Sequence, residues 1–410
     1  MSISRLAAAI AESPTMKLNE EATALRNSRQ PVIHLGIGEP KNPAPRAAID
    51  SAMTRLGTGL VKYTPASGIP ALKKAIVHYT AVNYGREVTP QHVIVTTGAK
   101  QAIFNALYAL VDDGDEVILL TPYWVSYPEM VRMLRGVPVV VRPAGGFGHP
   151  ALADVERAVT PRTKAVIVNS PNNPSGAVYG ESFVAPLVEF CETRGIYLMM
   201  DDIYHKLVFD GVTAPSCFAY TTRDQESTKL IVINGVAKTY GMTGFRIGWA
   251  VASREIITVM ANVQSQTTSC NSDVMQAAAE AALMGPQDEV EELRMFMQQN
   301  RDVVLEGLSK IPGVRTAKPA GTFYCLPDFS ACLGGPLART SLELAAFLLK
   351  KALVVTVPGF DFGAEGHLRL SYAGSTEDAA EGVARIRWAL DPSAPREIRM
   401  GDRTVVRDWL

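Results

Sequence analysis

The sequence contains few of the residues that build disulfide frameworks and metal centres. Its five cysteines are scattered over 410 residues and no Cys-x-x-Cys pair occurs, which indicates neither a disulfide scaffold nor a structural zinc site. The six histidines are equally dispersed, and His205 in "DDIYHKL" has no third ligand nearby in the sequence. We therefore expect no metal centre and take the cytoplasm as the default compartment.

A surplus of charge of either sign is also missing. The formal net charge is -1 at pH 7, so we expect neither nucleic acid nor an anionic membrane surface as a partner. The longest apolar runs have the length of a strand, well short of the ~20 residues that a membrane-spanning helix needs. The stretch "MSISRLAAAIAESP" is not typical of a signal peptide, because Glu12 follows the apolar run directly and no convincing cleavage site is present. We interpret it as an amphipathic first helix.

Common phosphate and hydrolase motifs are absent as well. "GIGEPKN" begins like a dinucleotide fingerprint, but its third glycine would fall at Lys41, and Pro40 would disturb the helix start. No P-loop and no Gly-x-Ser-x-Gly elbow occurs. In "TTGAKQAIF" a glycine turn leads into a predicted helix, where Gly98 and Ala99 could form a phosphate cradle. Taken alone, however, Gly98 merely turns the chain.

What the sequence does have is a series of short β-branched segments that alternate with helical patterns. Most lack period-2 alternation, which is typical of strands buried on both faces in a parallel sheet. The predicted strands lie in "HVIVTTG", "DEVILLT", "VPVVVRP", "KAVIVNS", "IYLMMDD", "KLIVING" and "RIGWAVAS". Polar signals directly follow several of them, so we expect distant parts of the chain to meet at the carboxyl edge of the sheet, where ligands bind.

The pattern changes after about residue 290, where "EVEELRMFMQQNRDVVLEGLSKI" predicts one long helix. Short strands and a further helix follow, as in a smaller α+β domain. The first ~45 residues have no strand series of their own. We therefore predict an N-terminal segment 1–45 that packs with the small domain, a large domain 46–290 and a small C-terminal domain 291–410. In the tail, "MGDR" could turn a short hairpin.

One stretch, "VINGVAKTYGMTGFRIGWA", places Lys238 and Arg246 among apolar and small residues with no acidic residue nearby. Burying two cations is costly unless each meets a partner, so either both side chains reach solvent or the stretch lines an anion site. A lysine at the end of an apolar strand is a candidate Schiff-base former, because burial lowers its pKa and frees the amine. Together with an acid that closes another strand and an aromatic platform, these two cations match what pyridoxal 5'-phosphate (PLP) requires.

The chain resembles the class I aminotransferases of the PLP fold-type I superfamily over roughly residues 5 to 390. The motifs that carry the resemblance are "KYTPASGIPALKKAI", "TTGAKQAIFNAL", "PYWVSYPEM", "NSPNNPSGAVY", "DDIYHKL", "NGVAKTYGMTGFRIGW" and "HLRLSYA". "PYWVSYPEM" and "GAKQ" point to the bacterial aspartate aminotransferase subgroup, some members of which also use prephenate. The resemblance implies an α/β fold of PLP fold type I, with a large domain whose mostly parallel seven-stranded sheet lies between helices, plus a smaller α+β domain.

The resemblance also implies the residues that hold the cofactor ring. Lys238 matches the lysine that forms the Schiff base with PLP and later shuttles the proton. Asp201 matches the carboxylate that pairs with the pyridinium nitrogen, and Asp202 is the weaker candidate for this role. Tyr204 and Asn173 match the two groups that hydrogen-bond the phenolate oxygen.

A second implied set surrounds the cofactor face and phosphate. Trp124 matches the ring stacked on the cofactor, and Arg246 matches the phosphate-binding arginine. Gly98 and Ala99 match the backbone cradle. Tyr63 matches a tyrosine that reaches the phosphate from the neighbouring subunit, which implies a homodimer with shared active sites.

On the substrate side, Arg369 matches the clamp for the α-carboxylate, where a guanidinium fork suits a planar anion. Gly38 matches a backbone contact to the same carboxylate. Lys100 of "GAKQ", next to the phosphate cradle, is implied to hold the distal carboxylate of a dicarboxylic substrate, and Ser13 and Thr15 line up with residues near that group. The full implied substrate set is Gly38, Lys100, Arg369, Ser13 and Thr15, together with Trp124 and Asn173.

Three features depart from the family pattern. Gly235 stands where many relatives have a phosphate-binding serine, and "GEPKNPAP" replaces the commoner Asp-Phe after Gly-Glu-Pro. "QSQTTSCNS" offers no arginine for a distal carboxylate. These departures affect the phosphate contact, the pocket mouth and the distal subsite respectively.

The implied reaction is a ping-pong transfer of an amino group from an L-amino acid, with aspartate first, to a 2-oxo acid, with 2-oxoglutarate first. An aminotransferase for aromatic or neutral amino acids or for prephenate stays open, as does a PLP-dependent C–S lyase. A PLP-binding regulator would need an attached DNA-binding domain, for which the aminotransferase core leaves no room.

Overall fold

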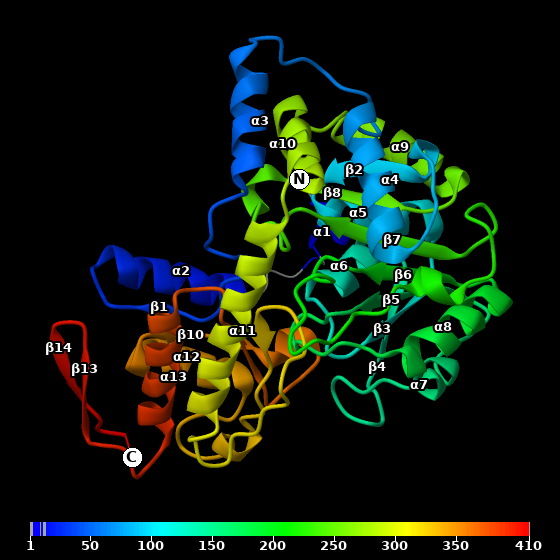
Figure 1. Cartoon of the computed structure of the whole chain (residues 1–410). Coiled ribbons are helices and arrows are strands. Elements are labelled where there is room, and N and C mark those ends of the chain that lie inside the picture. Colours follow the sequence, from blue (N-terminus) through cyan, green and yellow to red (C-terminus); the bar gives the residue numbers. More distant parts are fainter. Residues whose placement is uncertain (1–2, 9, 11–13, 410) are drawn as a thin grey trace.

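The computed structural model describes residues 3–8, 10 and 14–409, with the backbone alone at positions 5 and 14–17. A seven-stranded sheet forms its centre, in the order β2-β8-β7-β6-β5-β3-β4 (Figure 1). All neighbours pair in parallel except β8, which runs antiparallel to β2 and β7. The strands are β2 Val93–Thr97, β3 Glu116–Leu120, β4 Val137–Val141, β5 Thr163–Asn169, β6 Tyr197–Asp201, β7 Leu230–Gly235 and β8 Ile247–Val251. The predicted mostly parallel sheet and all its strands are therefore confirmed.

Helices cover both faces of this sheet, and the side chains of each strand alternate between the two layers. In β6, Leu198 and Met200 pack in one layer while Met199 packs in the other. The first layer is built with helices α4 (Pro70–Tyr84), α8 (Glu181–Arg194) and α10 (Asp273–Met284). The second is built with α5 (Ala99–Leu110), α6 (Ser126–Met133) and α9 (Arg254–Thr267).

Strand β4 differs from the expectation that most strands are buried on both faces. Val137 and Val140 in this strand are exposed, and β4 has β3 as its one neighbour in the described sheet. An edge strand is covered on fewer sides than a central strand. The sequence of β4 is as apolar as that of the central strands, and for this reason it did not reveal the exposure.

A second body packs around its own apolar core. Helices α11 (Asp288–Leu308), α12 (Ser341–Ala352) and α13 (Thr376–Leu390) surround an antiparallel sheet β11-β12-β9, formed by Val357–Pro358, Leu368–Ser371 and Tyr324–Cys325. Two parts of the N-terminal segment join this core. Leu18 and Ala22 of α2 (Pro14–Asn27) contribute side chains, and β1 (Ile33–His34) pairs in parallel with β10 (Val354–Val355). We propose that the domain boundaries lie near residues 45 and 290, where the chain passes from one of these cores to the other.

The remaining described elements are shorter or peripheral. They are α1 Arg5–Ala8, α3 Arg46–Gly57, α7 Leu152–Glu156, the 3-10 turns Pro90–His92, Cys217–Tyr220, Thr243–Phe245, Ser330–Cys332 and Gly359–Phe362, and the strands β13 Glu397–Met400 and β14 Arg403–Val406. β13 and β14 form the hairpin expected from "MGDR", with Met400 opposite Arg403, and it extends away from the central sheet (Figure 1). None of the described helices is long and apolar enough to cross a membrane.

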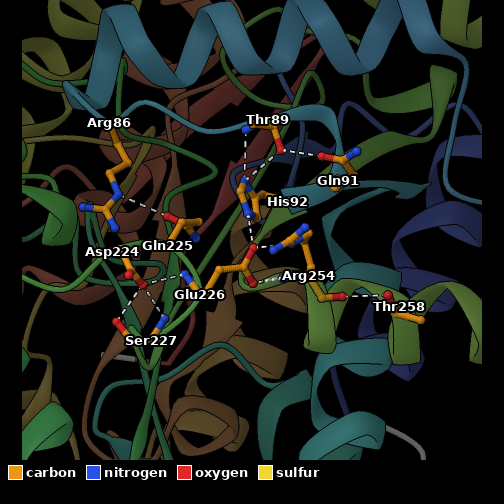
Figure 2. Close-up of polar contacts among 10 residues, drawn as sticks. All are labelled: Arg86, Thr89, Gln91, His92, Asp224, Gln225, Glu226, Ser227, Arg254 and Thr258. Atoms are coloured by element: carbon orange, nitrogen blue, oxygen red, sulfur yellow. Dashed lines mark hydrogen bonds and ion pairs between the residues drawn. The ribbon is translucent and has the colours of Figure 1, made fainter.

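A polar cluster ties together the amino-terminal edge of β2 and the loop that precedes β7 (Figure 2). His92 Nε2 lies 2.9 Å from Glu226 Oε1, and the backbone N–H of Arg254, at the start of α9, donates to Glu226 Oε2 at 3.2 Å. The Arg254 guanidinium pairs with the same carboxylate. Glu226 therefore serves as the acidic partner of a helix N-terminus at the edge opposite the carboxyl ends of the parallel strands.

Candidate active site

The carboxyl ends of the parallel strands open into a cavity of about 860 Å³. Its walls come from the N-terminal segment around Gly36–Glu39, from the strand ends of the large sheet, and from the second body at Tyr324, Phe362 and Arg369. Many of the predicted site residues line it: Gly38, Ala99, Lys100, Trp124, Asn173, Asp201, Tyr204, Lys238, Arg246 and Arg369. The topology thus brings together residues from seven separate motifs of the sequence.

Lys238 follows β7 and is half-buried in the cavity wall. Its Nζ donates to the carbonyl oxygen of Gly38, and no ion pair of Lys238 occurs within the described chain. The pKa of Lys238 is lowered from its usual value to about 8, first by burial and then by the positive charge of Arg369, while Glu39 opposes the change. A nucleophilic, uncharged amine is therefore accessible near neutral pH.

Asp201 ends β6 and is buried at the floor of the cavity. Its Oδ2 accepts a hydrogen bond of 2.5 Å from the hydroxyl of Tyr127, and its Oδ1 accepts one of 3.4 Å from the backbone of Ile203. Burial raises the pKa of Asp201 to about 6, whereas the Tyr127 hydrogen bond and the charge of Lys238 act in the opposite direction. Asp201 is therefore anionic at neutral pH.

Arg369 reaches the cavity from β12 and is held by two acceptors. Nη1 donates to Asn173 Oδ1 and Nη2 to the carbonyl oxygen of Gly36, both at 3.1 Å, and the guanidinium carbon lies 4.3 Å from the centre of the Tyr324 ring. Its Nε is buried and has no hydrogen-bond partner among the described residues. A buried charged donor without an acceptor is costly, so this geometry fits a missing anion such as a carboxylate.

Tyr204 and Asn173 lie on the wall between Asp201 and Arg369. Tyr204 is buried, and burial raises the pKa of its hydroxyl well above the usual value, so it remains a hydrogen-bond donor. The backbone N–H of Asn173 donates to Asn169 Oδ1 at 2.7 Å, and the Asn169 side chain in turn donates to the Asp201 carbonyl at 2.7 Å. Asn169 therefore couples the positions of two predicted site residues.

The residues of the predicted phosphate cradle lie where β2 leads into α5. The N–H of Gly98 donates to the Thr96 carbonyl at 2.8 Å, so the free donors are the first N–H groups of α5, beginning at Ala99. Gly98, at φ 77°, contributes space, since a Cβ there would lie 2.7 Å from Arg246 Nη2. A Cβ at Gly248 would lie 2.2 Å from the Ala99 nitrogen. Both glycines allow the strand end, the helix start and Arg246 to approach closely.

Arg246 and Lys100 are exposed to this end of the cavity without carboxylate partners in the described chain. Arg246 Nη1 donates to the Thr243 carbonyl at 3.2 Å. Lys100 Nζ lies 4.8 Å from the centre of the Trp124 ring, and desolvation followed by the charge of Arg246 lowers the pKa of Lys100. Two unneutralised cations at a helix N-terminus make this end suited to a phosphate or a carboxylate.

Four predicted residues are not among those that line this cavity, and one of them, Gly98, lies directly behind it at the start of α5. Tyr63, in the loop after α3, is 93% exposed and does not line it. Ser13 lies outside the described residues, and so does the side chain of Thr15, whose backbone belongs to α2.

Sequence reasoning missed several residues that shape the site: Tyr127, Asn169, Tyr324 and Glu39. Tyr127 stands three residues after Trp124, and its ring packs edge-on against that of Trp124 at 5.4 Å. The spacing of one helical turn was the signal available for it. Tyr324 and Glu39 come from segments whose approach only the tertiary structure reveals.

The residues present fit PLP. Arg246 and the α5 N-terminus supply donors for a phosphate, Asp201 supplies an anion for a ring nitrogen, and Tyr204 supplies a hydroxyl for an oxyanion. Lys238 supplies the amine for an aldehyde. The Nε of Arg369 is a further buried donor without a partner among the described residues.

Comparisons with known proteins agree with this chemistry. The pattern of the family described as "Aminotransferase class I and II" matches residues 30–386. The chain is 38% identical to the aspartate aminotransferase of Geobacillus stearothermophilus, over 96% of this chain and 100% of the relative. It is 41% identical to the aspartate/prephenate aminotransferase of Thermus thermophilus, over 95% and 98%. The solved structure of the Thermus thermophilus aspartate aminotransferase with maleate superposes with a TM-score of 0.88 at 40% identity, over 94% of this chain and 99% of that chain.

Proposed function

Because this chain belongs to the class I and II aminotransferases, an enzyme family that uses PLP, we propose that it transfers the amino group of L-aspartate to 2-oxoglutarate. The observation that supports a dicarboxylic substrate is the pairing of two cationic subsites in one cavity. Arg369 offers a buried, unpartnered Nε at one end, and Lys100 offers an amine without an ion pair at the other. A substrate with carboxylates at both ends can neutralise both.

For the cofactor, we propose that Lys238 binds its aldehyde, that Asp201 holds a proton at its ring nitrogen, and that Tyr204 and Asn173 donate to its phenolate oxygen. Trp124 covers its face. The phosphate is assigned to Arg246, Gly98, Ala99 and the start of α5 at Lys100. Bound PLP supplies an electrophilic carbon and an electron-withdrawing ring.

The chain's own catalytic steps follow from the placement of Lys238. Its amine is held by the Gly38 carbonyl, and its lowered pKa lets it act as a base near neutral pH. We propose that Lys238 removes the proton from the substrate Cα and delivers it to the carbon of the cofactor's aldehyde group. Gly38 and the Arg369 fork keep the substrate carboxylate fixed during the transfer.

Names of similar proteins support the choice of substrate. The Geobacillus relative is an aspartate aminotransferase, and the similar Thermus structure holds maleate, a dicarboxylate. Prephenate, another dicarboxylic compound, is the second candidate because the Thermus thermophilus relative is an aspartate/prephenate aminotransferase. That Ser13 and Thr15 contact the distal carboxylate stays a prediction from the family resemblance, and we propose the cytoplasm as the compartment.

We further propose a homodimer in which Tyr63 completes the phosphate site of the partner subunit. Tyr63 is 93% exposed, and the nearby apolar residues Met53, Leu56 and Leu60 are each more than 60% exposed. Such a cluster of large exposed apolar side chains around α3 is typical of a surface that is covered in an assembly.

The substrate proposal is tested by single half-reactions, followed through the absorption change of the cofactor. Aspartate and glutamate are expected to convert the cofactor, and alanine or phenylalanine to react far less. Lys100→Ala is expected to raise KM for aspartate about tenfold or more, since a hydrogen bond to a charged group contributes about 1.5–3 kcal/mol, and to leave KM for alanine unchanged. Lys310→Ala, at an exposed lysine just after α11, is the matched control. If neutral amino acids alone change the spectrum, the substrate proposal fails while the family assignment stands.

A further inference from the structure

The two adjacent carboxyl groups Asp201 and Asp202 face opposite layers of the sheet. Side chains in β6 alternate, with Met199 in the layer of α5 and α6 and Met200 in the layer of α4. The alternation continues past the strand end, because the N–H of Asp202 still donates to the Ile233 carbonyl at 2.9 Å. Asp201 accordingly meets Tyr127 of α6 and the cavity, while Asp202 meets Tyr84 of α4.

Asp202 is buried and has no cationic partner among the described residues. It is 3% exposed, and no ion pair involves it within the described part of the chain. Its side-chain hydrogen-bond partner is the Tyr84 hydroxyl. The titratable groups that surround it are Tyr79 and Tyr84 of α4, Cys217 of the 3-10 turn, Asp201 at the end of β6, and His205 and Lys206 after that strand.

Three of these neighbours, Tyr84, His205 and Tyr79, are linked by hydrogen bonds through Asn234. Asn234 Nδ2 donates to the Tyr84 hydroxyl at 2.7 Å and to His205 Nδ1 at 3.1 Å. The Tyr79 hydroxyl lies 3.2 Å from Nδ1 and 2.9 Å from Nε2 of the same His205 ring. Burial lowers the pKa of His205 to about 3, so the ring carries no charge at neutral pH. Lys206 lies over the outer face of the Tyr79 ring, 5.3 Å from its centre, and is not an ion-pair partner of Asp202.

The surroundings of the two carboxyl groups are therefore unequal. Asp201 has a hydroxyl donor at 2.5 Å, a backbone donor and the nearby Lys238 amine, whereas Asp202 has a phenol and no cation. Two neighbouring buried carboxylates cannot both be ionised without a large electrostatic cost. The proton shared by such a pair is expected on the member with the poorer anion site.

We propose that Asp201 and Asp202 together carry one negative charge, with the proton resident on Asp202, which makes Asp202 a positioning residue that keeps the charge on the cavity side of the sheet. This inference rests on the role proposed above for Asp201. The network of Tyr84, Asn234, His205 and Tyr79 holds the neutral acid in place. It thereby leaves Asp201 as the anion that faces the cofactor.

Infrared spectroscopy of the holoenzyme at neutral pH tests where the proton lies. Protein labelled with 13C-aspartate is expected to show the carbonyl band of a protonated carboxylic acid, shifted by the label, and Asp202→Asn is expected to remove it. Tyr84→Phe is expected to keep the band and move it to higher frequency, because the acid loses a hydrogen bond. Asp113→Asn, at an exposed aspartate, is the matched control and leaves the band unchanged. Absence of the band, or its loss in Asp201→Asn alone, overturns the proposal.

A pH titration of the cofactor absorption gives a second readout. Asp202→Asn replaces a neutral acid by a neutral amide, so the proton dissociation constant of the lysine-linked chromophore is expected to stay within about twofold of the parent. A change of about tenfold or more would mean that an anion had been removed, and would overturn the proposal. Asp201→Asn tests the underlying role separately. If it changes neither the cofactor absorption nor its affinity, the function proposed for Asp201 fails, while the infrared result for Asp202 stands independently.

Discussion

At the scale of single residues, the cavity concentrates cations that have no acidic partner of their own. Lys100, Lys238 and Arg246 form no ion pair within the described chain, and the Arg369 guanidinium is bonded to an amide and a carbonyl. Such an arrangement destabilises the empty protein, because like charges repel and buried donors lack acceptors. Binding of anionic groups removes this repulsion and supplies the acceptors. Stability is thus lowered for the sake of binding, as is often the case at active sites.

The lowered pKa of Lys238 leads to a prediction for the cofactor-free protein. Below pH 8 the amine is protonated in both the folded and the unfolded chain, so the full cost of holding that charge in the folded state is present. Between about pH 8 and the usual lysine pKa, the folded chain loses this proton while the unfolded chain keeps it. The cost therefore decreases as the pH rises through this range and is gone above it. Lys238→Met is therefore expected to stabilise the cofactor-free protein at pH 7, by an amount that shrinks between about pH 8 and 10.5. Urea unfolding across this range measures it, and a pH-independent difference would contradict it.

Tyr127 leads to a prediction about the acid limb of the activity profile. Tyr127→Phe removes the hydrogen bond to Asp201 and keeps the ring that packs against Trp124. Because this bond holds the pKa of Asp201 down, its loss raises that pKa above about 6, and activity is expected to be lost at higher pH than in the parent. We expect kcat at pH 7 to fall about tenfold, consistent with about 1.5 kcal/mol for a charged hydrogen bond.

Tyr240→Phe is the control for this experiment, since that buried hydroxyl bonds to Gln287 away from Asp201. It should leave the acid limb of the kcat profile in place. An unshifted limb in Tyr127→Phe would show that the hydrogen bond does not tune Asp201.

At the scale of elements, the carboxyl ends of the strands carry residues that line the cavity. At the opposite edge of the sheet, the Glu226 cluster links β2, α9 and the loop before β7. The sequence predicted all the strands of the central sheet because continuous apolar runs between helical patterns are a strong signal. It did not predict that β8 runs antiparallel or that β4 is exposed at an edge. Direction and position in a sheet depend on pairing between distant segments, which local patterns do not encode.

The Glu226 cluster gives a stability prediction at this scale (Figure 2). Glu226→Gln removes the charge that pairs with Arg254 and His92 at the start of α9, and we expect the free energy of unfolding to fall by about 1 kcal/mol after solvent screening. Glu306→Gln breaks the exposed pair with Lys310 and is expected to change the free energy of unfolding by much less, because solvent screens that pair. Chemical denaturation measures both variants. Equal effects would show that the cluster adds nothing beyond an ordinary surface ion pair.

At the scale of the whole molecule, the cavity lies between two bodies with separate cores and is bridged by the N-terminal segment. Gly36 accepts from Arg369, Gly38 accepts from Lys238, and Glu39 Oε2 accepts from Thr243 at 2.7 Å. This short loop therefore contacts Arg369, Lys238 and the turn at Thr243 that precedes Arg246. A change in its position is transmitted to all three sites at once.

The proposed shared site predicts complementation between subunits. Tyr63→Ala and Lys238→Ala are each expected to impair activity as pure proteins. In a mixed dimer, one of the two sites combines an intact Lys238 with an intact Tyr63 from the partner. After random subunit exchange, about one quarter of the parent activity is expected, since half the dimers are mixed and each has one intact site. Activity that stays at the mean of the two variants would contradict shared sites.

The sequence by itself determined the strands, the change of character near residue 290 and the set of polar residues at the strand ends, because these follow from local periodicity and from motifs with a fixed spacing. Only the tertiary structure decided which of these residues meet. It placed Tyr127 against Asp201 and left Arg369 Nε without a partner, and it directed Asp201 and Asp202 into opposite layers. Burial, hydrogen-bond partners and the resulting pKa values depend on contacts between segments far apart in the chain, and these exist only once the sheet has paired and the two cores have packed.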